Sequence, residues 1–258
     1  LFDVFHNPYG LNARDLTIRP VEARIDSYNI DCNLVESAIN KKTKAILAVN
    51  LYGQAAELSK LKDICNRNNL YLIEDNAQSQ GAKCHNKPTG SYGIINATSF
   101  YPGKNLGACG EAGGITTNNE KYQTHLHSLR NHGMKVRYFH DEIGYNMKMG
   151  GLEAVSLQVK VGYLDGWNAK RKAVAKAYQE RITNPKIKLQ AQPDHTDSVY
   201  HLFVVTTEDR DGLIKYLNQW FDLILMDQVE QYDHLDLFVF QFEYHLFLFY
   251  QNVYNTLK

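Results

Sequence analysis

The sequence predicts an α/β protein: a mostly parallel sheet flanked by helices, with a smaller C-terminal α+β domain. Two apolar segments, 44–50 and 70–74, have the length and composition of buried parallel strands. Between them, residues 57–68 repeat their apolar side chains at helical spacing. Strand, helix and strand at this spacing form a β–α–β unit, which requires a parallel sheet covered by helices.

Further elements follow along the chain. The runs 96–100 and 114–117 predict two more strands, and 119–130 predicts a helix. A long amphipathic helix is predicted to begin near Gly151, because apolar residues continue from there at helical spacing. They form roughly one stripe: Leu152, Val155, Val159, Leu164, Trp167, Val174 and Tyr178.

A helix this long commonly bridges a large domain and a small one. Residues 200–206 (YHLFVVT) predict a strand beyond it, which would belong to the small domain. We therefore expect a large domain over residues 1–165 and a small C-terminal domain over 166–258. The 258 residues are enough to form both.

Composition excludes several classes of protein. Lysine plus arginine (28) equals aspartate plus glutamate (28), so no overall field favours nucleic acid or an acidic membrane surface. The first ten residues lack the pattern of a signal peptide. The apolar run near the C-terminus is interrupted by Glu243 and His245, which disfavours a membrane span. These features predict a soluble, cytoplasmic protein.

The four cysteines, Cys32, Cys65, Cys84 and Cys109, are widely spaced and form no C-x-x-C pair. In a chain of this length they are typical of reduced residues in a cytosolic protein. Cys84 and His85 could form a metal-binding pair, but two adjacent residues rarely ligate a metal alone. A loop cysteine beside a loop histidine is the better interpretation, and we expect no metal site.

The chemistry is concentrated in four segments: 74–78 (EDNAQ), 99–107 (SFYPGKNLG), 110–114 (GEAGG) and 144–149 (GYNMKM). Asp75 follows a buried strand, at the sheet edge where α/β proteins bind ligands. Taken alone, such an aspartate is often a helix cap and a lysine in a turn is usually a surface charge. The order and spacing of the four segments make the pattern specific.

Three of these residues suit pyridoxal phosphate. That cofactor requires a lysine amine for an imine with its aldehyde, a carboxylate opposite its ring nitrogen, and hydroxyl and N–H groups around its phosphate. Lys104, Asp75 and Ser99 could supply them. A carboxylate beside the ring nitrogen keeps the pyridine protonated, so that the ring can accept electrons. Gln78, one turn beyond Asp75, would lie near the ring or its phenolic oxygen.

The motifs resemble those of the DegT/DnrJ/EryC1/StrS family of nucleotide-sugar aminotransferases, which have the aspartate aminotransferase fold (fold type I). The family shows E-D-x-A-Q, S-F-(Y/H)-x-x-K-N, G-(D/E)-x-G-G, R-N-H-G and G-x-N-x-(R/K)-(M/L). These correspond here to 74–78, 99–105, 110–114, 130–133 and 144–149. The resemblance extends from about residue 28 to about residue 217.

The resemblance implies a role for each matching residue near the cofactor. Asp75 would pair with the pyridinium nitrogen, Gln78 would contact the cofactor, and Ser99 would bind its phosphate. Lys104 would form the imine with pyridoxal phosphate. Asn146 would reach the phosphate of the neighbouring subunit's cofactor, since the family's sites form at the interface of a homodimer.

Three further residues are candidates for substrate binding. Lys148 occupies the family's Arg/Lys position, and its charge suits a substrate carboxylate or diphosphate; a solvated surface lysine is an equal alternative. His132 is a second candidate, with a structural loop histidine as its alternative. Tyr101 is the third.

The activity implied is transamination in two halves. L-glutamate would donate the amine, which then passes to a nucleotide-linked keto-sugar while Lys104 moves the proton. The segment 101–108 (YPGKNLGA) resembles the corresponding segment of family members that aminate carbon 3 of a dTDP-linked 3-keto-6-deoxyhexose more than that of members that aminate carbon 4. Two alternatives stay open: amination at carbon 4 and a truncated non-catalytic remnant. The family's 3-dehydratases are a further possibility, but they have histidine in place of the lysine, so Lys104 argues against them.

Both ends depart from the family pattern. The family carries a phosphate-binding G-(T/S)-x-A turn before the position of Asp31, and residues 7–16 (NPYGLNARDL) do not match it. We therefore expect the N-terminal part of the large domain to be missing. The family's H-Y-P-x-P segment is not found after Asn218, and the aromatic tail from Leu237 would promote aggregation if exposed.

Overall fold

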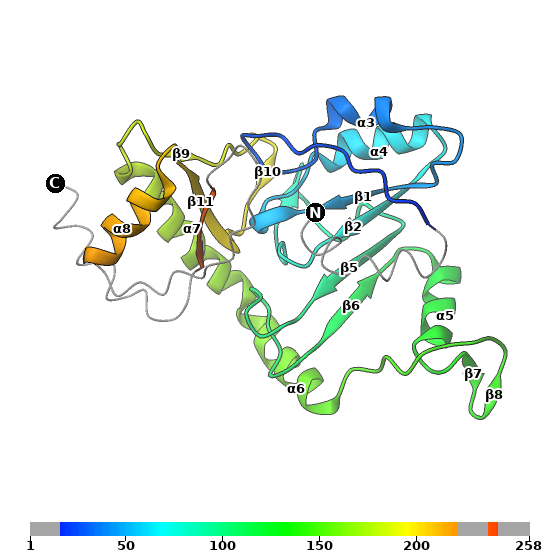
Figure 1. Ribbon diagram of the computed structural model, residues 1–258. Coiled ribbons are helices and arrows are strands. Elements are labelled where there is room, and N and C mark those ends of the chain that lie inside the picture. The colour runs from blue at the N-terminus through cyan, green and yellow to red at the C-terminus, as the bar shows by residue number, and fades with distance from the viewer. Residues whose placement is uncertain (1–15, 221–236, 242–258) are drawn as a thin grey trace.

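The main sheet of the computed structural model, which describes residues 16–220 and 237–241, has four strands (Figure 1). Their order is β1-β2-β5-β6: β1 (Ala45–Val49), β2 (Tyr71–Asp75), β5 (Ile95–Ser99) and β6 (Gly113–Thr116). The first three are parallel, and β6 runs antiparallel to β5. The predicted α/β class, the mostly parallel sheet and these four strands are confirmed, with shifts of one residue at each strand end.

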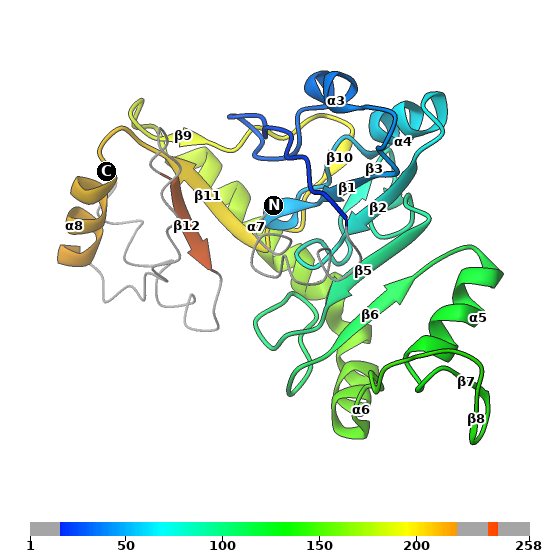
Figure 2. The same ribbon diagram turned by 45° about the vertical axis from the view of Figure 1, so that its right-hand side comes forward.

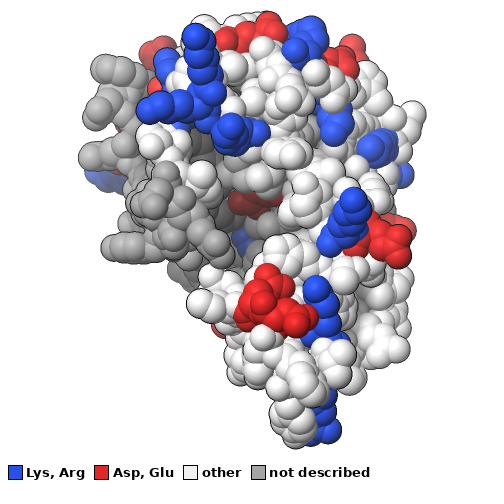
Figure 3. Space-filling model, turned by 90° about the vertical axis from the view of Figure 1, so that its right-hand side faces the viewer, with Lys and Arg blue, Asp and Glu red and all other residues white. Residues whose placement is uncertain are grey.

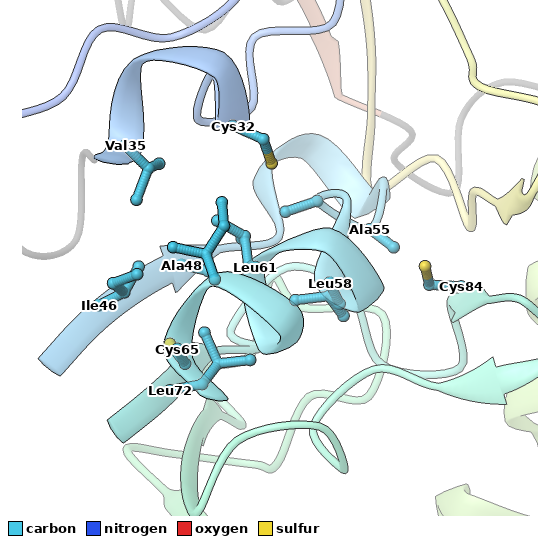
Figure 4. Close-up of a cluster of buried hydrophobic side chains, with 12 residues drawn as sticks. Cys32, Val35, Ile46, Ala48, Ala55, Leu58, Leu61, Cys65, Leu72 and Cys84 are labelled. Carbon is cyan, nitrogen blue, oxygen red and sulfur yellow. The ribbon is translucent and has the colours of Figure 1, made fainter. Parts of the chain in front are cut away.

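Helices α3 (Cys32–Ala38) and α4 (Leu58–Arg67) cover one face of this sheet. The predicted helix 57–68 is therefore confirmed. Its buried side chains pack with those of the two strands that flank it in sequence (Figure 4). The contributing residues are Leu58, Leu61, Ile64, Cys65, Ile46, Ala48 and Leu72. Burial of such aliphatic side chains stabilises the unit by about 1.5–3 kcal/mol each.

Shorter elements lie between the strands of the main sheet and after them. The 3-10 turn η1 (Leu51–Gly53) follows β1, and β3 (Lys83–Cys84) and β4 (Lys87–Pro88) form a hairpin after β2. Helix α5 (Glu120–Leu129) confirms the helix predicted over 119–130. It leads into a second hairpin, β7 (Met134–Val136) and β8 (Phe139–His140).

The predicted long helix is interrupted. Helix α6 (Gly151–Lys160) and helix α7 (Leu164–Arg181) are joined by a 3-10 turn, η2 (Val161–Tyr163). On α6 the predicted apolar stripe is exposed, with Leu152, Val155 and Val159 70%, 58% and 61% exposed. The reason is that α6 packs with another side, through Leu157, against Leu106 and Ala108 of the segment between β5 and β6, and turns the stripe outward.

A smaller antiparallel sheet lies beyond α7 (Figure 2). Its order is β12-β11-β9, with β9 (Lys188–Leu189), β11 (Leu202–Thr206) and β12 (Leu237–Gln241), and α8 (Arg210–Trp220) follows β11. Strand β11 confirms the strand predicted over 200–206, and its Phe203 and Val205 pack on Ala175 of α7. One more short strand, β10 (Thr196–Asp197), pairs with β3.

Several sequence-based expectations fall outside the described residues. They concern the N-terminal segment up to residue 15, the stretch in place of the H-Y-P-x-P motif, and the aromatic tail beyond residue 241. Within the described part, all four cysteines are free, and Cys109 alone among them is exposed. None of the described helices is long and apolar enough to cross a membrane.

Candidate active site

Asp75 lies at the carboxyl end of the central strand pair. It is the last residue of β2, opposite Val49 of β1 and Ala97 of β5. One carboxylate oxygen, Oδ1, accepts a hydrogen bond from the backbone N–H of Ala77 at 2.9 Å. The half-buried Asp75 thus caps the turn that follows β2, and the capping role proposed as an alternative exists alongside its position at the ligand-binding edge.

Gln78 points from this turn toward η1. Its Oε1 accepts a hydrogen bond from the backbone N–H of the buried Tyr52 at 2.7 Å. Gly53, the residue after Tyr52, has φ +93°, and a Cβ there would lie 2.5 Å from the backbone nitrogen of His201. Only glycine permits this close approach. Gln78 and η1 therefore connect the edge of the main sheet to the beginning of β11.

Ser99 and Lys104 lie at the end of the neighbouring strand. Ser99 is the last residue of β5, and its Oγ accepts a hydrogen bond from the N–H of Tyr101 at 3.2 Å. The N–H of Lys104 donates to the carbonyl of Tyr101 at 2.9 Å, which closes a tight turn. Gln80 donates to the carbonyl of Ser99 at 2.7 Å. Asp75, Gln78, Ser99 and the half-buried Lys104 are thus brought to one sheet edge.

The residue after Lys104 is fixed by a network that the sequence did not reveal. Nδ2 of the buried Asn105 donates to Oδ1 of Asn168 at 2.9 Å, and Nδ2 of Asn168 donates to the carbonyl of Gln80 at 3.0 Å. Oδ1 of Asn105 lies 3.0 Å from Nδ1 of His201. Because that oxygen can only accept, we assign the N–H of His201 to Nδ1.

His201 is a neutral side chain beside the lysine. Burial, together with the positive charges of Lys104 and Arg171, lowers the pKa of His201 to about 3. The network joins the Lys104 turn to α7 and to the beginning of β11. The asparagine of the K-N pair was its one sequence signal, since nothing in the spacing indicated His201 or Asn168.

Glu74, the other acidic residue of the EDNAQ segment, has a structural role. It is fully buried, and its carboxylate accepts four hydrogen bonds. The donors are Nδ2 of Asn50 (3.1 Å) and the backbone N–H groups of Gly90 (2.8 Å), Tyr92 (2.6 Å) and Gly93 (2.9 Å). This carboxylate fixes the loop between β4 and β5 against the sheet and is not available to a ligand.

Three predicted site residues lie on a different part of the chain, in and around the hairpin that follows α5. Asn146 forms an isolated bridge with Asn131, and the N–H of His132 donates to the carbonyl of Tyr145 at 2.9 Å. Asn146 and Lys148 are exposed and His132 is half-buried, with φ +61°. In Figures 1 and 2 the segment from β8 to α6 passes below the sheet, away from β11 and α7. Tyr101, the remaining candidate for substrate binding, lies in the turn that presents Lys104 and is 52% exposed.

Figure 3 shows a hollow in one face of the molecule, with acidic and basic side-chain atoms on its floor. A recess that carries both signs of charge is suited to a small ligand with separate anionic and cationic groups.

The main sheet and the residues at its carboxyl edge define the fold of the pyridoxal-phosphate-dependent transferases of fold type I, which is the fold of the structural neighbours. A family model described as the DegT/DnrJ/EryC1/StrS aminotransferase family matches residues 12–223. The chain belongs to this family.

The names of the relatives are those of sugar transaminases and of sensory or regulatory proteins. The chain is 37% identical over 210 residues to a dTDP-3-amino-3,4,6-trideoxy-alpha-D-glucose transaminase of Streptomyces venezuelae, covering 81% of this chain and 55% of the relative. It is 42% identical over 199 residues to the erythromycin biosynthesis sensory transduction protein EryC1 of Saccharopolyspora erythraea (77% and 54%). The chain therefore spans about half the length of these relatives.

Among solved structures, the chain is similar to DesV of S. venezuelae in complex with a ketimine intermediate. The TM-score is 0.79 at 37% sequence identity, and the similarity covers 82% of this chain and 57% of that one. The range matched by the family model, residues 12–223, includes both the main sheet and the segments that carry the site.

Proposed function

We propose that this chain carries the cofactor site of a pyridoxal-phosphate-dependent sugar aminotransferase. The observation that carries the proposal is the convergence of Asp75, Ser99 and Lys104 at the carboxyl ends of two adjacent parallel strands. A carboxylate, a hydroxyl and an amine at one edge are the groups that this cofactor requires. Membership of the family supports the same assignment.

Each residue has a distinct task in this proposal. The amine of Lys104 would hold the cofactor and, when free, could carry a proton during amino transfer. The carboxylate of Asp75 would pair with the ring nitrogen and favour its protonated form. The hydroxyl of Ser99 contributes to phosphate binding, and Gln78 contacts the ring. When bound, the cofactor supplies the electron sink that amino transfer needs.

His201 maintains the electrostatic environment of Lys104 in this scheme. A neutral imidazole adds no positive charge beside the amine, and it does not compete with the amine for the proton. Asn105 and Asn168 hold the ring in a single tautomer. We assign His201 and Asn105 as positioning residues for the turn that presents Lys104.

The proposed substrates are L-glutamate as amino donor and a dTDP-linked 3-keto-6-deoxyhexose as acceptor. Support for carbon 3 comes from the name of the S. venezuelae relative, which is a 3-amino-sugar transaminase. Lys148, His132 and Tyr101 are the proposed contacts to the substrate. A lysine charge can pair with the diphosphate or with the carboxylate of glutamate.

The proposed assembly is a homodimer with shared sites, in the cytoplasm. The outward face of α6 supports it, because three apolar side chains there are more than half exposed, and Met147 of the adjacent loop is 65% exposed. A contiguous apolar surface of this kind marks an interaction site. Asn146 lies in the same loop, so association through this face would bring it to a partner's cofactor. The division into domains at 1–165 and 166–258 is part of the proposal.

Amino transfer can be tested with the purified protein and pyridoxal phosphate. Release of 2-oxoglutarate from L-glutamate, dependent on a dTDP-3-keto-6-deoxyhexose, is the expected result. The matched acceptor with its keto group at carbon 4 should react at least about tenfold more slowly, since a misplaced keto group loses the near-attack geometry. Equal rates would contradict the carbon-3 assignment. Cofactor binding without transfer to either acceptor would favour the non-catalytic alternative.

A further inference from the structure

A group of three potential metal ligands lies where β3 pairs with β10, outside the proposed cofactor site. Cys84 is the last residue of β3 and pairs with Thr196 of β10. His85 follows Cys84, and His195 precedes β10. Their three ligand atoms, one sulfur and two ring nitrogens, all lie within 4.8 Å of one another.

The fold brings these side chains together through rigid backbone contacts. The N–H of His85 donates to the carbonyl of His195 at 2.7 Å, next to the β3–β10 pairing. The hydroxyl of Tyr92 donates to the carbonyl of Cys84. The cluster therefore joins the β3–β4 hairpin to the segment that leads into β11, two regions that are far apart in sequence.

The three ligand atoms lie close enough together to bind one zinc ion after small side-chain movements. Three atoms within 4.8 Å of one another share a point no more than about 2.8 Å from each, which is 4.8 Å divided by √3. Zinc requires about 2.0–2.1 Å to nitrogen and about 2.3 Å to sulfur, so each donor has to move by less than about 1 Å. One thiolate and two imidazoles are ligands that zinc prefers, and water can take the fourth position.

One ring has to turn for the lone pairs to converge. The rings of His85 and His195 are stacked, with centroids 4.5 Å apart and planes inclined by 14°. Parallel rings cannot both point a lone pair at one ion. His85 is exposed, so rotation about its side-chain bonds meets no packed neighbour on its solvent side, whereas Cys84 is fully buried and fixes the sulfur.

Two observations distinguish this cluster from ordinary packing. Within the described residues, the ring nitrogens of His85 and His195 have no hydrogen-bond partner, so both lone pairs are available. His85 also has φ +46°, a left-handed conformation that costs a side chain with a Cβ about 1 kcal/mol or more. The hairpin turn at this position favours glycine or asparagine, and here it carries a histidine beside two other donors.

We propose that Cys84, His85 and His195 form a zinc site that links the β3–β4 hairpin to the segment at β10. The sequence predicts no metal at Cys84 and His85, since two adjacent residues rarely ligate alone. The fold supplies the third ligand from a distant segment. A zinc ion bound in this way would stabilise the folded state by mass action, and its binding is independent of the cofactor site.

The test is metal binding by the tag-free protein, measured by equilibrium dialysis with Zn²⁺ and by a difference spectrum with Co²⁺. We expect one zinc per chain, a higher Tm with zinc, and a thiolate-to-cobalt charge-transfer band. His195→Gln and His85→Gln should each weaken binding on the order of 100-fold or more, because removal of a ligand exceeds the 10–100-fold effect of removing its outer-shell partner. Cys84→Ala should abolish the charge-transfer band.

Two matched controls keep the result interpretable. His127→Gln removes an exposed histidine of α5, and Cys109→Ser removes the exposed thiol, and both should bind zinc like the unmodified protein. If Cys84→Ala does not fold, the two histidine variants decide, because His85 is exposed and His195 only half-buried. No zinc retained on dialysis, or equal affinity in His195→Gln and His127→Gln, would overturn the proposal.

Discussion

The edge of the main sheet and the loop between β8 and α6 carry two halves of the same predicted site, and they differ in how the chain fixes them. At the sheet edge, Asp75 and Ser99 end adjacent strands, and buried hydrogen bonds from Asn105 and Gln80 hold the turn that presents Lys104. On the loop, Asn146 and Lys148 are exposed, and the apolar face of the adjacent α6 is unpartnered within the described part of this chain.

This difference indicates which half can function within one chain. The groups proposed to hold the cofactor are oriented by contacts inside the chain. Within the described residues, backbone contacts of Asn146 and His132 connect them to Asn131, Tyr145 and the side chain of His140, at the end of α5 and in the hairpin region. A second chain seated against α6 would complete their surroundings. The comparison therefore predicts local effects for mutations at the sheet edge and assembly-dependent effects for mutations in the loop.

The largest effect is expected for Asp75→Asn. An amide cannot hold the ring nitrogen protonated, so turnover should fall by at least about 100-fold, the scale of removing one charge-stabilising group. The amide oxygen can still accept the hydrogen bond from Ala77, so the circular dichroism spectrum should be unchanged. Steady-state kinetics with L-glutamate would measure the loss. Near-normal turnover would mean that Asp75 is only a cap.

The next effect tests whether the loop belongs to a shared site. Lys104→Ala and Asn146→Ala proteins should each be nearly inactive. After subunit exchange, half of the dimers are mixed, and one of their two sites has neither change. Activity should therefore recover to about a quarter of the unmodified level. The assay is amino transfer after mixing, with exchange followed by mass spectrometry of the dimers. A mixture as inactive as its parents, despite demonstrated exchange, would contradict the shared site.

Glu74→Gln should affect stability more than chemistry. The side-chain amide would turn an NH₂ group toward backbone N–H donors and leave at least one of them unpaired. The free energy of unfolding should fall by about 3 kcal/mol, as for hydrogen bonds to a buried charge. Urea denaturation would measure it. Glu36→Gln, which breaks an exposed pair with Arg67, is the matched control and should change stability by less than about 1 kcal/mol. Equal losses in the two variants would refute the role of Glu74.

The smallest expected effect is the pH dependence of folding stability that arises from His201. Its pKa is lowered in the folded state, to about 3, below the ordinary histidine value of 6.5. The unfolded chain then binds the extra proton between these values. Stability from this group is complete above pH 6.5 and falls as pH decreases toward 3, by up to about 1.4 kcal/mol per pH unit.

The control for this prediction is the variant His201→Asn. Urea denaturation at pH 6.5 and pH 4.5 should show a weaker pH dependence in the variant than in the unmodified protein. His127→Gln, an exposed histidine in α5, should keep the dependence of the unmodified protein. The same slope in all three proteins would mean that His201 titrates normally.

The sequence predicted the β–α–β unit and its strand ends because buried parallel strands leave a strong apolar signal. Asp75, Ser99 and Lys104 could be found because each occupies a fixed position after a strand. His201, Asn168 and His195 could not, since their contacts depend on how α7, β10 and the segment before β11 pack against residues far away in the sequence. The exposed face of α6 was missed for a related reason: helical periodicity shows an apolar stripe but not whether its own chain covers it.

The central claim is that Lys104 carries the cofactor, and covalent labelling tests it most directly. The protein would be incubated with pyridoxal phosphate, reduced with borohydride, digested and mapped by mass spectrometry. We predict that the phosphopyridoxyl group is on the peptide with Lys104, and that Lys104→Ala loses the label while Lys148→Ala keeps it. Label that persists in Lys104→Ala, or that is distributed over other lysines, would contradict the account.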